Sequence, residues 1–222
     1  MRIRALVFDF DGLILDTETP EFIAWQEVFA EYEKEIDIST WTDYVGRASE
    51  EFDPHTYLES LVGRPLDRVE IRTKRRRRNR DLLLAEPVLP GVATCISQAK
   101  ELNLKIGIAS SSPRGWVVQH LERIGLLHYF DSIKTKDDVL KCKPSPDLYL
   151  SAIHDLNVSP REAIAFEDSP NGALAAKAAG LLCVAIPNSI TQGLTFEMAD
   201  LRLSSLSDYT LSMILQRLDG RA

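Results

Sequence analysis

The sequence predicts an α/β protein with a doubly wound parallel sheet and an inserted α-helical domain. Short apolar runs alternate along most of the chain with amphipathic helical segments, as in a parallel sheet covered on both faces. Residues 17–86 depart from this pattern, because every convincing element there is helical and no buried-strand run occurs. We therefore expect an α/β core made of residues 1–16 and 87–222, and a helical domain of residues 17–86 inserted after the first strand.

Composition limits the class of protein. The chain has 222 residues and a formal net charge of −7, which argues against a polyanion such as nucleic acid as the main partner. No apolar run approaches the ~20 residues of a membrane span, and the first residues enter a core strand directly, so we expect a cytoplasmic protein without a signal peptide. Cys95, Cys142 and Cys183 lack zinc-site spacing and are expected to be free thiols.

The first strand, expected over residues 3–8, ends in two carboxylates. Asp9 and Asp11 follow the apolar run, and Gly12 comes directly after them. Side chains two residues apart on an extended chain point the same way, so the two acids are expected to share one side. Like charges at such a distance are unfavourable without compensation, and a hard divalent cation such as Mg²⁺ would supply it.

The inserted domain begins with a helix for which Thr19 is the expected cap. Apolar residues then recur at three- and four-residue spacing and give one buried face. The run Lys74–Arg80 is the strongest charge cluster, and we interpret it mainly as a solvated helix face. Two alternatives stay open, a nucleic-acid patch or an arginine that reaches an anionic substrate. On a helix at most one or two of these side chains can face a cleft.

The core resumes after the Pro- and Gly-containing linker at residues 86–91. Helices are expected near residues 92–102, 113–125, 145–156 and 169–180, with a closing helix near the end of the chain. Strands are expected at residues 104–109, 132–135, 163–166 and 182–186, with a short one at 201–203.

Polar residues follow several of these strands. Ser110 follows the second strand, and Glu167 and Asp168 follow the fourth, as Asp9 and Asp11 follow the first. Ligands of parallel α/β sheets bind outside the carboxyl ends of the strands, so these side chains are expected to meet at one edge. Each has an ordinary interpretation by itself, such as a turn or a helix cap, and their coincidence indicates a site.

Together these positions resemble the four motifs of the haloacid-dehalogenase-like superfamily, in order and over nearly the whole chain. Asp9, Asp11 and the pair Asp16-Thr17 match the first motif, and Ser110 matches the second. Lys143 matches the third, and Glu167-Asp168 the fourth. The sequences around Lys143 and Glu167 are similar to those of the beta-phosphoglucomutase-like phosphatase branch. The resemblance implies a Rossmann-like core with a helical cap.

The resemblance also implies a phosphatase mechanism. Asp9 would be the nucleophile that forms an aspartyl-phosphate, and Asp11 the general acid and base. Ser110, the Ser111 amide and Lys143 would bind the phosphate oxygens.

The implied cofactor is Mg²⁺. Its ligands would come from Asp9, Asp11 through its backbone carbonyl, Asp168 and, as a further ligand or neighbour, Glu167. Thr17, Glu21 and Arg47 are weaker candidates for substrate contact from the cap side.

Three other functions are compatible with parts of the sequence. Dehalogenases of the superfamily lack the second motif-one aspartate, so Asp11 argues against that reaction. Phosphomutases of this branch commonly carry a His at the position of Glu21, and its absence favours hydrolysis. A nucleic-acid-binding protein on an inactive scaffold is the distant alternative. We expect a small phosphorylated metabolite as partner, a sugar phosphate before a nucleotide or phosphoglycolate, no membrane, and a monomer or weak dimer.

Overall fold

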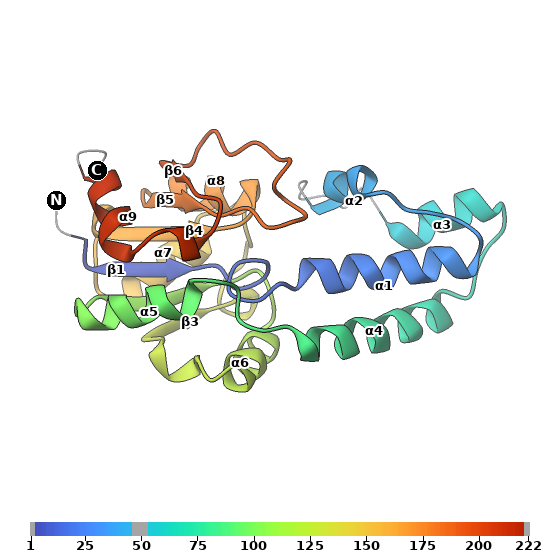
Figure 1. Cartoon of the computed structure of the whole chain (residues 1–222), viewed down its shortest axis with the longest axis horizontal. Helices are drawn as coiled ribbons and strands as arrows, with labels where there is room; N and C mark the ends of the chain where they lie inside the picture. Colours follow the sequence, from blue (N-terminus) through green and yellow to red (C-terminus); the bar gives the residue numbers. More distant parts are fainter. Residues whose placement is uncertain (1–2, 46–52, 220–222) are drawn as a thin grey trace.

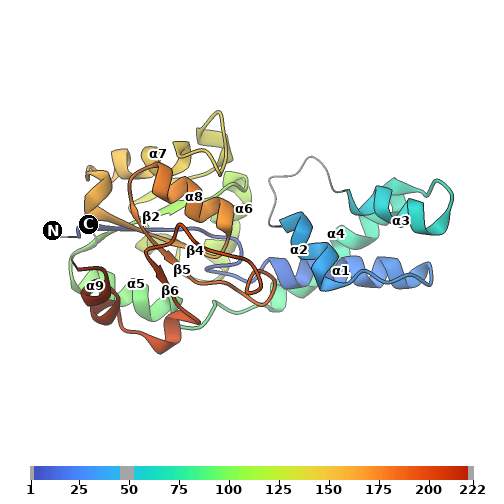
Figure 2. The same cartoon turned by 90° about the horizontal axis from the view of Figure 1, so that it is seen from above.

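A computed structural model describes residues 3–45 and 53–219. Two bodies lie end to end in both views of the chain (Figures 1 and 2). One contains a sheet with helices on its two faces, and the other consists of the helices α1 to α4. Within the described ranges, no helix has the length and hydropathy that a membrane span requires.

The sheet is parallel throughout, in the strand order β3-β2-β1-β4-β5-β6. Its strands are β1 (Ala5–Phe8), β2 (Lys105–Ala109), β3 (Ser132–Lys134), β4 (Ala163–Glu167), β5 (Leu182–Ala185) and β6 (Leu201–Arg202). The chain runs outward from β1 in one direction through β2 and β3, and then returns to the other side of β1 with β4. The point between β1 and β4 is where doubly wound sheets place their ligands. The predicted fold class is confirmed.

Alternating side chains divide the core into two layers. Leu6 and Phe8 of β1 pack in a cluster with helices α5, α6 and α9, whereas Ala5 and Val7 pack in a second cluster with α7 and α8. Because successive residues of a strand point to opposite faces, a strand of four buried residues supplies both layers. The helices of the core are α5 (Val92–Glu101), α6 (Arg114–Arg123), α7 (Asp147–Asp155), α8 (Pro170–Ala178) and α9 (Leu211–Leu218). Short 3-10 turns occur at Leu127–Tyr129, Lys136–Asp138, Pro160–Glu162 and Leu206–Asp208.

The helical body has a hydrophobic cluster of its own. It contains α1 (Glu18–Glu31), α2 (Ile38–Val45), α3 (Pro54–Val62) and α4 (Arg68–Ala85), with α1 packed along α4. Trp25 and Phe29 of α1 are buried against residues of the other helices, as the three- and four-residue spacing predicts. Ile190, which belongs to the core part of the sequence, is buried in the same cluster. A core loop therefore contacts the helical body.

The start of α1 differs from the prediction. The helix begins at Glu18, and the side chain of Asp16 accepts hydrogen bonds from the backbone N–H groups of Glu18 and Thr19 at 3.2 and 2.9 Å. Asp16 therefore caps the helix three residues before the expected cap Thr19, because its oxygen reaches both of these N–H groups. Thr19 instead pairs with Ser189 through its hydroxyl, at 3.0 Å.

The two chain segments that join the bodies are paired with each other. Leu15 and Val88 form an antiparallel bridge, and the Leu89 N–H donates to the Ile14 carbonyl at 2.9 Å. Gly12 begins this connection with φ at +75°, a conformation that side chains other than glycine rarely adopt. The domain boundaries expected at residues 16–17 and 86–87 stay a proposal. The first helix of the helical body, α1, begins at Glu18, and its last helix, α4, ends at Ala85, so both lie inside these boundaries.

Candidate active site

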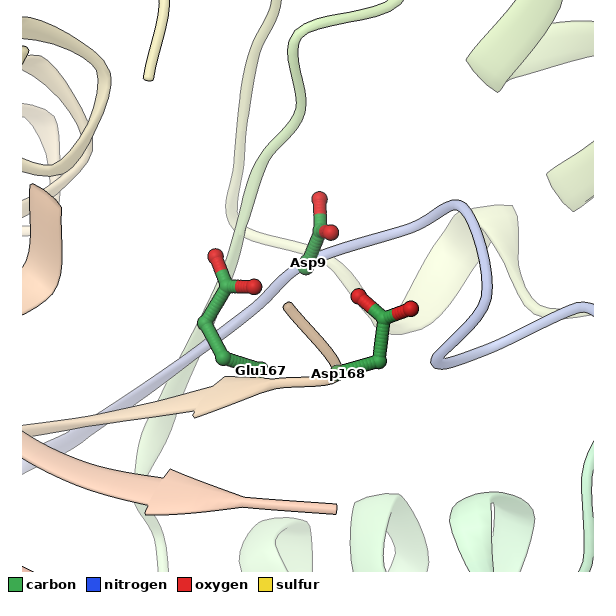
Figure 3. A group of neighbouring side chains, drawn as sticks. All are labelled: Asp9, Glu167 and Asp168. Atoms are coloured by element: carbon green, nitrogen blue, oxygen red, sulfur yellow. The ribbon is translucent and has the colours of Figure 1, made fainter. Parts of the chain in front are cut away.

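Three buried carboxylates meet at the ends of two neighbouring strands. Asp9 follows β1, and Glu167 and Asp168 lie at the end of β4, which pairs with β1. One oxygen atom from each lies within 4.8 Å of the others (Figure 3). Figure 3 shows Asp9 between the other two, with the three carboxylates around a common space. The parallel pairing of β1 with β4 brings these distant sequence positions together.

Burial and mutual repulsion raise the pKa of these acids. Desolvation raises the pKa of Asp9 and Asp168, and desolvation raises that of Glu167 to about 7. Asp9 adds to the effect at both neighbours through its own negative charge. The cluster therefore holds more negative charge than its surroundings compensate. Three carboxylate oxygens in one buried space form a donor set that fits a hard divalent cation.

Lys143 is the cation that faces this cluster. Its Nζ lies 2.8 Å from Asp9 Oδ1 and 2.6 Å from Glu167 Oε1. Burial opposes its charge, but Asp9 and Glu167 outweigh that effect and raise the pKa of the lysine. The hydroxyl of Tyr149 on α7 donates to the same Glu167 oxygen at 2.5 Å. Glu167 thus fixes Lys143 beside Asp9, in a position to neutralise charge near the carboxylate.

Small residues make room for the acids. A Cβ atom at Gly172 would lie 1.9 Å from Glu167 Oε2, so a larger residue on α8 would displace that carboxylate. A Cβ atom at Gly12 would lie 2.2 Å from Asp168 Oδ2. The glycines behind the first and fourth motifs therefore permit close approach, which gives a physical reason for their place in the sequence.

The carboxylate of Asp11 points to a different set of groups. Ser112 Oγ donates to Asp11 Oδ2 at 2.7 Å, and Trp116 Nε1 donates to Asp11 Oδ1 at 2.9 Å. Ser110 is completely buried, and its hydroxyl donates to Asp11 at 3.3 Å and accepts from the Ser112 N–H. The Asp11 side chain is not part of the three-carboxylate group. Its predicted metal contact through the backbone carbonyl stays a prediction.

A cavity of about 410 Å³ opens onto these residues. Its wall contains residues of the core and of the helical body together. The lining residues are Asp9, Asp11, Thr17, Glu18, Glu21, Asn79, Ser111, Ser112, Trp116, Lys143, Asp168, Ser169 and Asn171. The cavity has the size of a small-metabolite site and combines acids, one lysine and neutral hydrogen-bonding groups.

The helical body contributes polar groups to the cavity wall. The buried Thr17 Oγ1 has no hydrogen-bond partner among the described residues. Burial and the charges of Asp11, Glu21, Asp16 and Asp9 raise the pKa of Glu18 to about 8.

The predicted contact Glu21 also lies on this wall. Arg75 and the side-chain amide of Asn79 both donate to its carboxylate. Arg47, the third predicted cap contact, lies outside the described residues.

The arginine run on α4 is not a uniform solvated face. Arg76, Arg77 and Arg78 are exposed, as expected, whereas the Arg75 side chain is 16% exposed. Arg75 pairs with Glu21 and lies over the Trp25 ring, 5.5 Å from its centroid. Arg75 thus approaches the cavity wall through Glu21. This agrees with the expectation that at most one or two side chains of the run can face a cleft.

Several lining residues were missed by sequence reasoning. Ser112 and Trp116 hold Asp11, and Glu18, Asn79 and Asn171 line the cavity. Two signals were available. Ser112 belongs to a run of three serines after β2, and Asn171 lies within the fourth motif. Trp116 and Asn79 carried no such signal, because their approach depends on how the helices pack.

Comparisons with known proteins agree with this geometry. Residues 3–180 match the family model of haloacid dehalogenase-like hydrolases. The chain is 47% identical to the candidate phosphatase YhcW of Bacillus subtilis over 99% of both chains. It is 31% identical to beta-phosphoglucomutase of the same organism, over 96% of this chain and 94% of the relative. The crystal structure of CbbY from Rhodobacter sphaeroides in complex with phosphate superimposes with a TM-score of 0.71 and 30% identity, covering 95% of this chain and 98% of the other.

Proposed function

The chain belongs to the haloacid dehalogenase-like hydrolase family and is a phosphatase of that family, and we propose that it hydrolyses a small sugar-like phosphate monoester through an aspartyl-phosphate on Asp9. One observation carries the proposal. Asp9 lies on the cavity wall beside the Lys143 ammonium, at 2.8 Å, and within the group of three buried carboxylates. A nucleophile at this position has the Lys143 ammonium beside it, which can neutralise phosphate charge. It also has Glu167 and Asp168 beside it, which would bind a metal ion.

The proposed reaction has two displacements. An Asp9 oxygen attacks phosphorus, the bond from phosphorus to the substrate alcohol breaks, and Asp11 gives that alcohol a proton. Water then attacks the phosphorus of the aspartyl-phosphate, Asp11 accepts its proton, and inorganic phosphate leaves with Asp9 restored. Lys143 stabilises phosphate oxygens during both steps, and the Ser111 N–H and the Ser110 side chain are proposed to assist.

Mg²⁺ is the proposed cofactor. Asp9, Asp168 and Glu167 would hold it together with the Asp11 carbonyl, and the bound ion would neutralise phosphate charge so that an anionic nucleophile can approach. The raised pKa values of Asp9 and Asp168 support this assignment, since a cation would offset the repulsion between acids that contributes to them.

The substrate class follows from the cavity wall and the relatives. From the helical body and its connection, the wall offers Thr17, Asn79 and Glu21, which can bond to hydroxyl groups. A relative named beta-phosphoglucomutase acts on a phosphorylated sugar. We therefore propose a sugar or polyol phosphate as the substrate.

A panel assay tests the proposal. Purified protein with Mg²⁺ should release inorganic phosphate from sugar and polyol monophosphates faster than from nucleotides or phosphoglycolate. Conversion of glucose 1-phosphate to glucose 6-phosphate without phosphate release would identify a mutase and overturn hydrolysis. Preferred turnover of nucleotides or phosphoglycolate would overturn the substrate class alone.

A further inference from the structure

Asn188, in the loop after β5, contacts the acidic cluster from behind. Its Nδ2 donates to Asp168 Oδ2 at 2.8 Å and to the Gly12 carbonyl at 3.2 Å. Asn188 lines a second cavity of about 350 Å³, on the other side of the Gly12 loop, and is not on the wall of the candidate active site. It therefore reaches a predicted metal ligand without facing the substrate space.

The orientation of the Asn188 amide is fixed by the loop itself. The backbone N–H groups of Ile190 and Thr191 donate to Asn188 Oδ1 at 2.9 and 3.0 Å. Because these donors can pair only with the oxygen of the amide, the NH₂ group has to face Asp168 and Gly12. Each side of the amide thus has a separate role, one in folding the turn and one in holding the acid.

The position of the loop is fixed on its other side as well. Ile190 is buried in the hydrophobic cluster of the helical body, and Ser189 pairs with Thr19 at the start of α1. The turn is therefore held between the two bodies. Asn188 does not need to reorganise to keep its contact with Asp168, so the hydrogen bond acts as a fixed restraint.

The contact controls the placement of one Asp168 oxygen. In the described part of the chain, Asn188 supplies the hydrogen bond that reaches the Asp168 carboxylate. The Gly12 backbone lies so close that a Cβ there would be 2.2 Å from Asp168 Oδ2 and 2.6 Å from Asn188 Nδ2. With Oδ2 held behind the site, the other oxygen of Asp168 is left for the space that it shares with Asp9 and Glu167.

We propose that Asn188 is a positioning residue for the metal site, which holds Asp168 and the Gly12 loop in fixed relation so that the carboxylate is preset for a divalent cation. This inference rests on the proposed function, because it assumes that Asp168 binds Mg²⁺. Groups that orient metal ligands typically contribute about 10- to 100-fold to metal affinity. Asn188 touches neither substrate nor metal in this account and acts through Asp168.

The test separates the two roles of the amide. In Asn188→Ser the hydroxyl can still accept from the backbone N–H groups of the turn, but it is too short to donate to Asp168. Thr191→Val is the matched control, because it removes the hydroxyl that pairs with Asn188 N and Oδ1 while leaving the Nδ2 contacts in place. Mg²⁺ binding to metal-free protein is measured by titration calorimetry, and the free energy of unfolding is measured in chelator.

We expect Asn188→Ser to weaken Mg²⁺ binding about 10-fold or more, with Thr191→Val within about twofold of wild type and both variants folded. Saturating Mg²⁺ should restore most of kcat in Asn188→Ser. Wild-type affinity in Asn188→Ser, or an equal loss in both variants, would overturn the positioning role and leave the proposed function intact. Absence of Mg²⁺ binding by the wild type would instead overturn the metal assignment, and the inference with it.

Discussion

At the scale of single residues, Glu18 is an acid on the cavity wall whose protonation differs between the folded and the unfolded chain. Burial and four neighbouring acids raise its pKa from 4.5 to about 8. Between these values the folded chain keeps a proton that the unfolded chain has released, so the free energy of unfolding falls as pH rises. The loss is complete above the folded pKa.

Glu18→Gln should remove this contribution. In chelator, the variant should gain stability relative to wild type as pH rises from 5 to 9, by no more than about 1.4 kcal/mol per pH unit. Denaturant unfolding at several pH values measures the difference. Glu122→Gln, at an exposed position of α6, is the control for the loss of one carboxylate from the chain. An identical pH dependence in Glu18→Gln and wild type would show that Glu18 is ionised normally in the folded chain.

Tyr149 supports a second buried acid. Its hydroxyl donates to Glu167, which is completely buried and also pairs with Lys143. Tyr149→Phe should lower the free energy of unfolding by about 1–3 kcal/mol, because a buried acceptor loses a donor.

Tyr129→Phe is the matched control for this change, since the structure gives the Tyr129 hydroxyl no hydrogen bond within the described chain. It should shift the unfolding free energy by less than about 0.5 kcal/mol. Equal effects of the two substitutions would mean that the bond to Glu167 contributes nothing to stability.

At the scale of elements, α4 has one arginine that differs from its neighbours. Arg75 is mostly buried between Glu21 and the Trp25 ring, whereas Arg77 is exposed and has no described partner. Arg75→Ala removes the cation that pairs with the partly buried Glu21 and should cost about 1–3 kcal/mol of stability. Arg77→Ala should change stability by less than about 0.5 kcal/mol. Thermal unfolding of both variants checks this, and equal losses would return Arg75 to the solvated face.

The order of elements could be predicted from sequence because hydrophobic periodicity reports local structure. The strands β2 to β5 begin and end within one residue of their expected bounds. The start of α1 could not be predicted, because Asp16 and Thr19 are both suitable caps and only backbone geometry selects Asp16. The acids could be located because each follows a recognisable strand end, whereas Lys143 lies in the loop before α7 and was located by its motif alone.

At the scale of the molecule, the residues that sequence reasoning missed are those brought in by packing between distant segments. Asn188 lies 20 positions after Asp168, in a turn whose sequence matches no motif. It contacts Asp168 because β4 and β5 are adjacent in the sheet. Asn79 and Trp116 reach the cavity from α4 and α6, whose relative placement depends on the connection between the two bodies.

The cavity and the acids at its base also predict how the whole enzyme responds to metal removal. Hydrolysis of an aryl phosphate should require a divalent cation, because Lys143 alone cannot balance three buried acids together with a bound phosphate. EDTA should abolish turnover, and excess Mg²⁺ should restore it. A continuous assay of phenolate release measures both. Full activity in chelator would contradict the metal assignment.

In the proposed mechanism, Asp9 carries the phosphoryl group during turnover. Asp11→Asn should still be phosphorylated by an aryl or acetyl phosphate, whose leaving group needs little protonation, and should then hydrolyse slowly because the attacking water has lost its base. Mass spectrometry of acid-quenched protein measures the result directly. We predict a phosphorylated peptide containing Asp9 in Asp11→Asn and none in Asp9→Asn. Label retained in Asp9→Asn, or turnover by that variant comparable to wild type, would contradict the account.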